Sequence, residues 1–160
     1  MATVLLSILI SFPTESAQLI SALSTPGHKT APVDPRSYLG MYKAAADACP
    51  GLPWTVVAAI GEVESQHGRL AARSRAGAMG PMQFLPDTWK AYATDGDHNG
   101  SADVNSPADA IATAGRLLCA NGGATRATLA TAIWNYNHSW EYVVKVLSVS
   151  AQLETAQGGS

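Results

Sequence analysis

The sequence predicts an all-α fold with minimal β structure, and two observations favour it. Helix formers and helix start signals recur along the chain, whereas alternating Val, Ile and Thr runs that are typical of strands are nearly absent. Apolar residues make up 47% of the 160 residues and charged residues only 14%, so the chain can bury a core and is not wholly disordered.

Start and stop signals place six helices, in order: at 37–49, from 53 to about 64, from 86 through Trp89 and Tyr92, from 107 to the stop at Asn121-Gly122, at roughly 125–137, and from 140 onward. Proline opens the second, third and fourth of these segments, where its missing N–H is tolerated. Gly68 lies just past the second helix, the pair Asn121-Gly122 stops the fourth, and Ser139 caps the last.

The two ends of the chain differ from this helical part. Residues 24–35 (STPGHKTAPVDP) carry three prolines and indicate a linker. We therefore expect an N-terminal apolar segment and linker at 1–36, a folded domain at 37–152 and a flexible tail at 153–160. Residues 4–12 (VLLSILISF) have the apolar core of a secretory signal, but no Lys or Arg precedes Lys29. The alternatives are an amphipathic helix interrupted at Pro13 and a fragment of a longer chain.

Charge and cysteine content exclude several classes of function. A net charge of −2 offers no electrostatic footprint for nucleic acid or an anionic membrane. No apolar run of 18 residues lacks polar interruption, which argues against a transmembrane span. Two cysteines and four scattered histidines, without an HExxH-like spacing, make a zinc site unlikely.

Glu62 and Glu64 stand out near the end of the second predicted helix. Residues two positions apart on a helix are separated by about 200° of rotation around its axis. Both carboxylates therefore cannot face one cleft, and one of them is expected to be exposed. Glu64 lies among apolar neighbours beside a Gly-rich loop, where desolvation raises the pKa of a carboxyl. A raised pKa is what a general acid needs near neutral pH, although most single glutamates are solvated helix residues.

Three ordered motifs resemble those of the bacterial lytic transglycosylases, which have a lysozyme-like fold. They are Glu64-Ser65, residues 74–83 (SRAGAMGPMQ) and residues 135–139 (NYNHS). The spacing from Glu64 to Ser74 resembles the soluble lytic transglycosylases, whereas GAMGPMQFLPDTWKAY and PADAI resemble the membrane-bound lytic transglycosylase B family. This chain lacks the long insertion that the latter family usually has between its catalytic Glu and the GAMG loop.

The resemblance implies a peptidoglycan lytic transglycosylase that cleaves the β-1,4 bond between N-acetylmuramic acid (MurNAc) and N-acetylglucosamine (GlcNAc) and forms 1,6-anhydro ends. Glu64 matches the single catalytic acid and base, and no cofactor is required. Ser74, Gln83, Tyr136 and Asn137 match substrate-side positions, Tyr136 being the tyrosine that orients the catalytic Glu. A buried structural hydroxyl is an equal interpretation of Tyr136. We expect a monomer that contacts peptidoglycan strands and is secreted or associated with the cell wall.

Residues 95–109 (DGDHNGSADVNSPAD) form an acidic loop that resembles an EF-hand. Asp95, Asp97 and Asn99 take the first three ligand positions, Gly100 the sharp-turn position and Ser101 the carbonyl position. Ser106 stands where the bidentate Glu belongs, but the resemblance to lytic transglycosylase B includes a longer loop that ends at a matching Asp109. The loop therefore predicts either a structural Ca²⁺ site or a solvated turn.

Cys49 and Cys119 lie near the ends of two predicted helices. Because the implied substrate is outside the cytoplasm, we favour a disulfide between them; two free buried cysteines are the alternative.

Two rival functions also fit the motifs. One is a hydrolytic muramidase on the same fold, and the other is a non-catalytic, calcium-stabilised wall-binding module.

Overall fold

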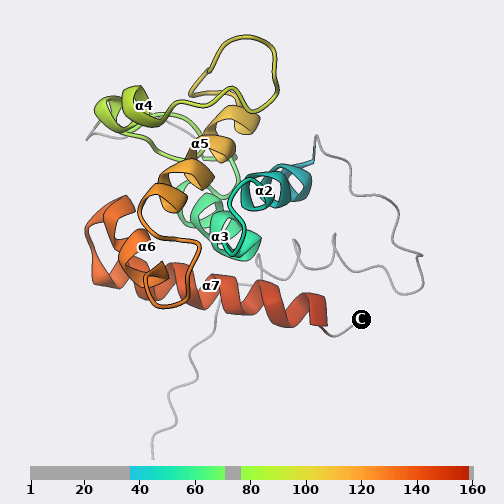
Figure 1. The fold of residues 1–160 in the computed structure, drawn as a ribbon, viewed down its shortest axis with the longest axis vertical. Coiled ribbons are helices and arrows are strands. Elements are labelled where there is room, and N and C mark those ends of the chain that lie inside the picture. Colours follow the sequence, from blue (N-terminus) through green and yellow to red (C-terminus); the bar gives the residue numbers. More distant parts are fainter. Residues whose placement is uncertain (1–36, 71–76, 159–160) are drawn as a thin grey trace, which may run out of the picture.

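The computed structural model describes residues 37–70 and 77–158 (Figure 1). Its helices are α2 (Tyr38–Asp47), α3 (Trp54–Ser65), α4 (Pro86–Tyr92), α5 (Pro107–Ala120), α6 (Leu129–Asn137) and α7 (Trp140–Gly158). Within this part of the chain, β structure is limited to an isolated bridge between Met79 and Phe84. The predicted all-α fold with minimal β structure is confirmed. The predicted segment at 1–36 and Ser74 lie outside the described residues.

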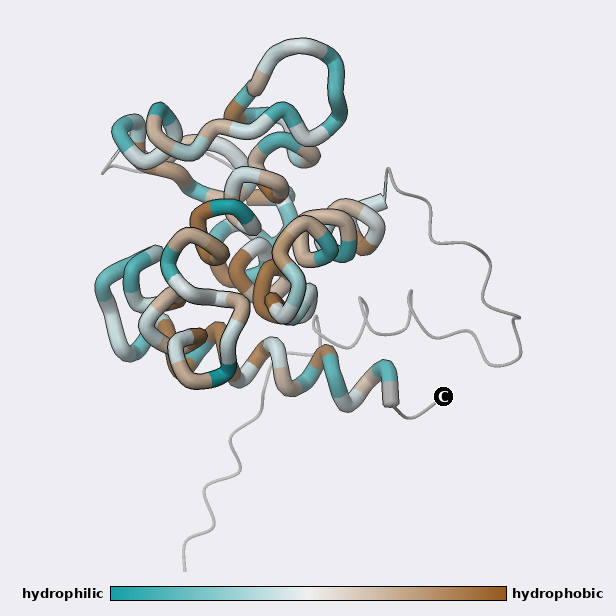
Figure 2. The backbone as a smooth tube through the Cα atoms, in the orientation of Figure 1, coloured by the Kyte–Doolittle hydropathy of each residue, from teal (hydrophilic) through white to brown (hydrophobic). Residues whose placement is uncertain are grey.

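Helix α3 forms the centre of the fold. Val56, Val57, Ala59 and Ile60 are essentially inaccessible to solvent, so this helix is apolar on nearly all sides and needs neighbours all round. It packs against α2, α5 and α7, and α7 also supports α6. Figure 1 shows α7 running along one side of the molecule beneath α3 and α6, while Figure 2 shows hydrophilic residues gathered in the loop between α4 and α5.

The predicted helix starts are confirmed where a cap is present. The Ser37 side chain accepts a hydrogen bond from Gly40 N at 3.1 Å at the start of α2. The fifth predicted helix begins later than expected, at Leu129 instead of residue 125. The Thr128 hydroxyl donates to Gly122 O at 2.5 Å, a local bond that competes with helix formation over residues 125–128.

Helix α7 continues to Gly158, beyond the expected end of the domain at Gln152. Its last turns remain attached to α3, because Thr55 donates to Glu154 Oε1 at 3.2 Å and Ser150 donates to Thr55 Oγ1 at 2.8 Å. The folded part therefore includes most of the segment that was expected to be a flexible tail.

A disulfide joins Cys49, just after α2, to Cys119, near the end of α5, across 70 residues of sequence. The predicted bridge is confirmed, and it fixes two helices that also pack against each other. None of the described helices has the length and apolar content that a bilayer crossing requires.

Candidate active site

Glu64 lies on the last turn of α3, half-buried against the first turn of α7. The hydroxyl of Tyr142, on α7, donates to Glu64 Oε1 at 2.7 Å. Burial raises the pKa of the Glu64 carboxyl, while the hydrogen bond from Tyr142 and the charge of Lys145 act in the opposite direction. The result is a half-buried carboxyl of raised pKa with a fixed orientation, which is suited to proton transfer.

Tyr136 takes a different place from the one the resemblance implied. Its hydroxyl donates to the carbonyl of Met82 at 2.8 Å, and the hydroxyl that orients Glu64 belongs to Tyr142 instead. The two tyrosine rings lie parallel, with centroids 6.4 Å apart and an interplanar angle of 5°. Burial raises the pKa of Tyr136, so this hydroxyl stays protonated and serves as a donor.

The loop over residues 77–84 is held close to Glu64 through its neighbour Ser65. The buried Ser65 hydroxyl donates to Pro81 O at 2.5 Å and accepts from Gly68 N at 2.7 Å. Within the loop, Met79 and Phe84 exchange two backbone hydrogen bonds of 2.9 Å. The sequence pair Glu64-Ser65 thus places a carboxyl beside the loop and ties the loop to the same helix end.

Gly80 needs both its left-handed backbone and its lack of a side chain. Its φ is +70°, and a Cβ there would lie 1.9 Å from the carbonyl oxygen of Val104. The 77–84 loop therefore touches the acidic loop directly. Gln83 also has a positive φ, of 51°, and its side-chain amide donates to Gly80 O at 2.8 Å.

The remaining predicted site residues are only partly brought together. Gln83 lies in the 77–84 loop and is partly exposed, whereas Asn137 is exposed at the end of α6. Glu62 is not the exposed surface carboxylate that was expected as the partner of Glu64. It is half-buried, and its Oε2 lies 3.1 Å from Nε2 of His67.

Sequence reasoning missed Tyr142 as the partner of Glu64. The sequence places this residue only within the last predicted helix, from 140 onward. A tyrosine in the first turn of a helix does not by itself indicate which residue its hydroxyl will contact, and the contact with Glu64 spans 78 residues of sequence. The packing of α7 along α3 creates it.

The acidic loop brings three carboxylates together. Oxygens of Asp95, Asp97 and Asp109 all lie within 4.8 Å of one another. Asp109 is completely buried; its Oδ1 accepts from Gly96 N at 2.7 Å and Asp97 N at 3.3 Å, and its Oδ2 from Asp103 N at 2.9 Å. The hydrogen bond from Gly100 N is the main cause that lowers the pKa of Asp95, so this group stays ionised.

Ca²⁺–O distances of about 2.3–2.6 Å place opposite ligands roughly 5 Å apart, so the spacing of these oxygens fits one calcium ion. The carboxylates of Asp95 and Asp109 still have lone pairs that the backbone N–H groups do not use. The Asn99 side chain accepts from Ser101 N at 3.0 Å, which holds the next two predicted ligands in a turn.

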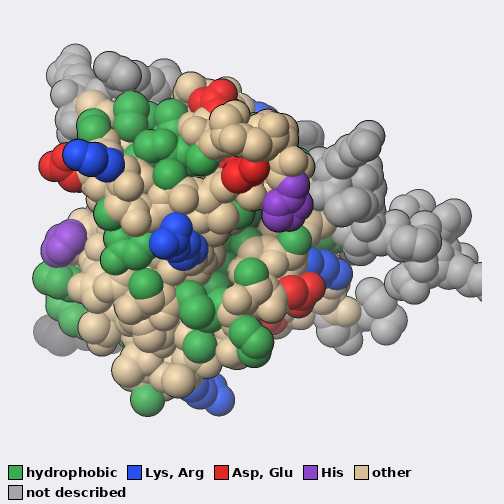
Figure 3. Space-filling view, turned by 45° about the horizontal axis from the view of Figure 1, so that its top comes forward, with side chains coloured by type: hydrophobic (Ala, Val, Ile, Leu, Met, Phe, Trp, Pro, Cys, Tyr) green, Lys and Arg blue, Asp and Glu red, His purple; other side chains and the backbone are tan. Residues whose placement is uncertain are grey.

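The described residues on the face in Figure 3 show no concentration of positive charge, as expected from the net charge of −2. On the face shown in Figure 3, Lys and Arg side chains among the described residues are scattered and form no basic patch. This face offers no continuous surface for a polyanion.

The family comparison finds a match to the segment that follows Glu64. Residues 71–133 match the family model of the transglycosylase SLT domain. This segment is therefore similar to a transglycosylase SLT domain. The matched segment includes the 77–84 loop and the acidic loop, but it begins after Glu64 and ends before Tyr136 and Tyr142. The assignment of Glu64 therefore depends on geometry and motif spacing.

Solved structures share the fold of this chain. Escherichia coli lytic transglycosylase Slt35 in complex with calcium matches with a TM-score of 0.64 at 17% identity, over 88% of this chain and 78% of the other. Soluble lytic transglycosylase SltB1 from Pseudomonas aeruginosa matches with a TM-score of 0.63 at 16% identity, over 88% and 89%. The fold is thus the lysozyme-like fold of lytic transglycosylases. Comparison with curated protein sequences finds no match.

Proposed function

We propose that this protein is a peptidoglycan lytic transglycosylase in which Glu64 is the single catalytic acid and base. The observation that carries the proposal is the half-buried Glu64 carboxyl, with a raised pKa, oriented by Tyr142 beside the 77–84 loop of the SLT domain. The substrate would be the glycan strand, cleaved between MurNAc and GlcNAc.

Protonated Glu64 would first donate its proton to the oxygen of the scissile glycosidic bond. As that bond breaks, the acetamido group of MurNAc can stabilise the oxocarbenium-like centre, as in other substrate-assisted glycosidases. The resulting Glu64 carboxylate would then remove the proton from the C6 hydroxyl of MurNAc. The C6 oxygen attacks the anomeric carbon, closes the 1,6-anhydro ring and returns the proton to Glu64.

Tyr142 supports this use of one carboxyl in two steps. Its hydroxyl occupies Oε1, which leaves Oε2 of Glu64 to exchange the proton with substrate. The attacking C6 hydroxyl is covalently tethered to the sugar, so its effective concentration exceeds that of competing water. Of the other predicted residues, we assign Ser74, Gln83, Tyr136 and Asn137 to binding of the glycan.

We further propose that the acidic loop binds one structural Ca²⁺. Asp95, Asp97 and Asp109 would provide carboxylates, Asn99 its side-chain oxygen and Ser101 its carbonyl. The three carboxylates within 4.8 Å support the site, and Slt35, which has the same fold, was solved with calcium. The ion would stabilise the loop and take no part in the glycosidic reaction. We place the protein at the cell wall, outside the cytoplasm, a setting that permits the Cys49–Cys119 disulfide.

Digestion of purified peptidoglycan, followed by mass spectrometry of the released fragments, tests the function. Wild-type protein is expected to release fragments with anhydro ends, and Glu64→Gln to lower the rate at least a hundredfold, because an amide cannot transfer the proton. Glu141→Gln, an identical change at an exposed glutamate of α7, is the control and should keep full activity.

The products also distinguish the alternatives. Reducing ends, with water added, would indicate a hydrolytic muramidase on this fold. Retention of glycan strands without any release, unchanged by Glu64→Gln, would indicate a wall-binding module and would refute catalysis.

A further inference from the structure

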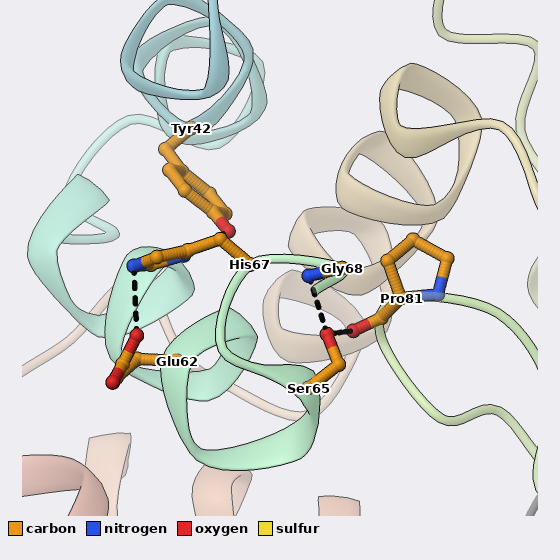
Figure 4. Close-up of polar contacts among 6 residues, drawn as sticks. All are labelled: Tyr42, Glu62, Ser65, His67, Gly68 and Pro81. Atoms are coloured by element: carbon orange, nitrogen blue, oxygen red, sulfur yellow. Dashed lines mark hydrogen bonds and ion pairs between the residues drawn. The ribbon is translucent and has the colours of Figure 1, made fainter. Parts of the chain in front are cut away.

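Behind Glu64, three polar side chains form a chain of contacts that the proposed reaction does not use. The hydroxyl of Tyr42, on α2, lies 2.8 Å from Nδ1 of His67, and His67 Nε2 lies 3.1 Å from Oε2 of Glu62 (Figure 4). Tyr42 is almost fully buried at 2% exposure. When Nδ1 accepts from the Tyr42 hydroxyl, the proton of neutral His67 lies on Nε2, next to Glu62 Oε2, a close polar contact without hydrogen-bond geometry.

Gly61 makes room for this arrangement. A Cβ at this position of α3 would lie 2.1 Å from the Tyr42 hydroxyl oxygen. Glycine in the interior of a helix costs about 1 kcal/mol relative to alanine. The approach of Tyr42 across α3 provides a physical reason for that glycine.

His67 lies in an unusual turn directly after the end of α3. Gln66, His67 and Gly68 have successive φ values of 51°, 56° and 85°. Left-handed conformations at two adjacent non-glycine residues are unfavourable and persist where surrounding contacts determine them. Here the His67 ring is held from both sides, and its backbone N–H donates to Gly61 O at 3.0 Å.

This turn determines where the catalytic part of the helix end lies. Gly68 N donates to Ser65 Oγ at 2.7 Å, and Ser65 donates to Pro81 O in the 77–84 loop. Glu64 lies between Glu62, which belongs to the clamp, and Ser65, which holds the loop. A change in the turn would therefore displace the carboxyl relative to the loop.

We propose that His67 is a positioning residue for Glu64: clamped between Tyr42 and Glu62, it holds the left-handed turn that fixes the end of α3 against the 77–84 loop. This inference deepens the proposed function and rests on it for its kinetic test. Protonation of His67 would reverse the first contact, because Nδ1–H would then donate to the Tyr42 hydroxyl, whose own proton would lose this acceptor.

The surroundings of His67 keep it neutral. Burial lowers its pKa most strongly; the charge of Glu62 acts in the opposite direction, and Arg69 lowers the pKa further. Tyr38 and Tyr42 of α2 face the ring, with centroids at 6.0 and 5.6 Å.

The test combines kinetics with a direct measurement on Glu64. Tyr42→Phe and Glu62→Met each remove one side of the clamp, because neither new side chain can form a hydrogen bond with the imidazole, while the length of the side chain is nearly kept. We expect kcat on soluble glycan strands to fall about tenfold and KM to stay within twofold. Tyr92→Phe on α4 removes a tyrosine hydroxyl outside the clamp and should leave both constants unchanged. Folded variants with wild-type kcat would overturn the proposal.

A second readout separates this inference from the proposed function. The titration of the Glu64 carboxyl, followed by carbon-13 NMR, is expected to shift toward its ordinary pKa in Tyr42→Phe, because a loosened helix end admits water. If wild-type protein cleaves no glycan, the shift in the Glu64 titration alone tests the positioning role of His67. Its presence would support positioning although the enzymatic proposal has failed, and an unchanged Glu64 titration would overturn the positioning role.

Discussion

The Tyr142 hydroxyl donates to Glu64 Oε1 and lowers the pKa of that carboxyl against the effect of burial. Tyr142→Phe should therefore raise the pKa of Glu64 further and release the carboxyl from its fixed orientation. We expect kcat to fall about tenfold, equivalent to ~1.4 kcal/mol of lost stabilisation. Carbon-13 NMR titration of Glu64 and kinetics on glycan strands measure the two effects. A pKa of Glu64 that falls or stays constant in Tyr142→Phe would contradict this assignment.

His67 makes stability depend on pH in a defined window. Its folded pKa is lowered from the ordinary value of 6.5, so the unfolded chain binds the proton more readily. Stability is complete above about pH 6.5 and declines as the pH falls toward the folded pKa. His67→Asn tolerates the left-handed backbone and does not titrate, so it should flatten this decline by up to ~1.4 kcal/mol per pH unit.

Urea unfolding of wild type and His67→Asn between pH 5 and 7.5 measures this difference. The quantity to compare is the slope of the free energy of unfolding against pH, since the substitution also changes the absolute stability. Parallel slopes would show that the acid sensitivity arises elsewhere, for example in the carboxylates of the acidic loop.

The site was predictable where adjacent residues share one motif and unpredictable where distant helices meet. Glu64 was identified from its apolar neighbours and the following loop, and the structure shows it half-buried with a raised pKa. Neither Tyr142 nor the Tyr42–His67–Glu62 clamp could be read from local pattern. Each depends on which turn of α7 or α2 lies against α3, and periodicity identifies a helix face without identifying its neighbour.

At the scale of the element, the acidic loop depends on Asp109, a buried carboxylate that accepts three backbone N–H groups. Asp109→Asn would direct an amide donor toward an N–H and remove one calcium ligand. We expect a loss of ~1–3 kcal/mol of folding stability without calcium. Wild-type protein should gain about 2–3 kcal/mol when Ca²⁺ reaches 100-fold over its Kd, a gain that Asp109→Asn should lack.

Thermal unfolding in chelator and in millimolar Ca²⁺ measures both effects, and Mg²⁺ at the same concentration is the control. Equal calcium stabilisation of wild type and Asp109→Asn would refute the site.

Comparison of predicted and observed helix boundaries shows which local sequence signals are sufficient to locate a helix end. Helix α2 began where Ser37 caps it, and α5 began at the predicted Ser106-Pro107 signal. The start of α6 was placed too early because the Thr128 bond to Gly122 O requires a turn geometry that composition does not reveal. The end of the folded domain was placed too early, at Gln152, because the last turns of α7 are held by Thr55, which is distant in sequence.

At the scale of the whole molecule, the Cys49–Cys119 disulfide closes a loop of 70 residues. The chain-entropy model assigns about 4 kcal/mol to a loop of this length. The double variant Cys49→Ala, Cys119→Ala should lose roughly this amount in urea unfolding, with α2 and α5 still packed in the native state. An unchanged unfolding midpoint would show that the bridge does not constrain the unfolded chain.

The contact between Gly80 and the Val104 carbonyl joins two segments whose tasks differ. One segment borders the Glu64 carboxyl, which we propose to react, and the other would hold a cation. Since a Cβ at position 80 would not fit between them, a change in the backbone of one segment at this contact requires a matching change in the other. A designer who transplants one of these loops into another scaffold would need to transplant its neighbour as well.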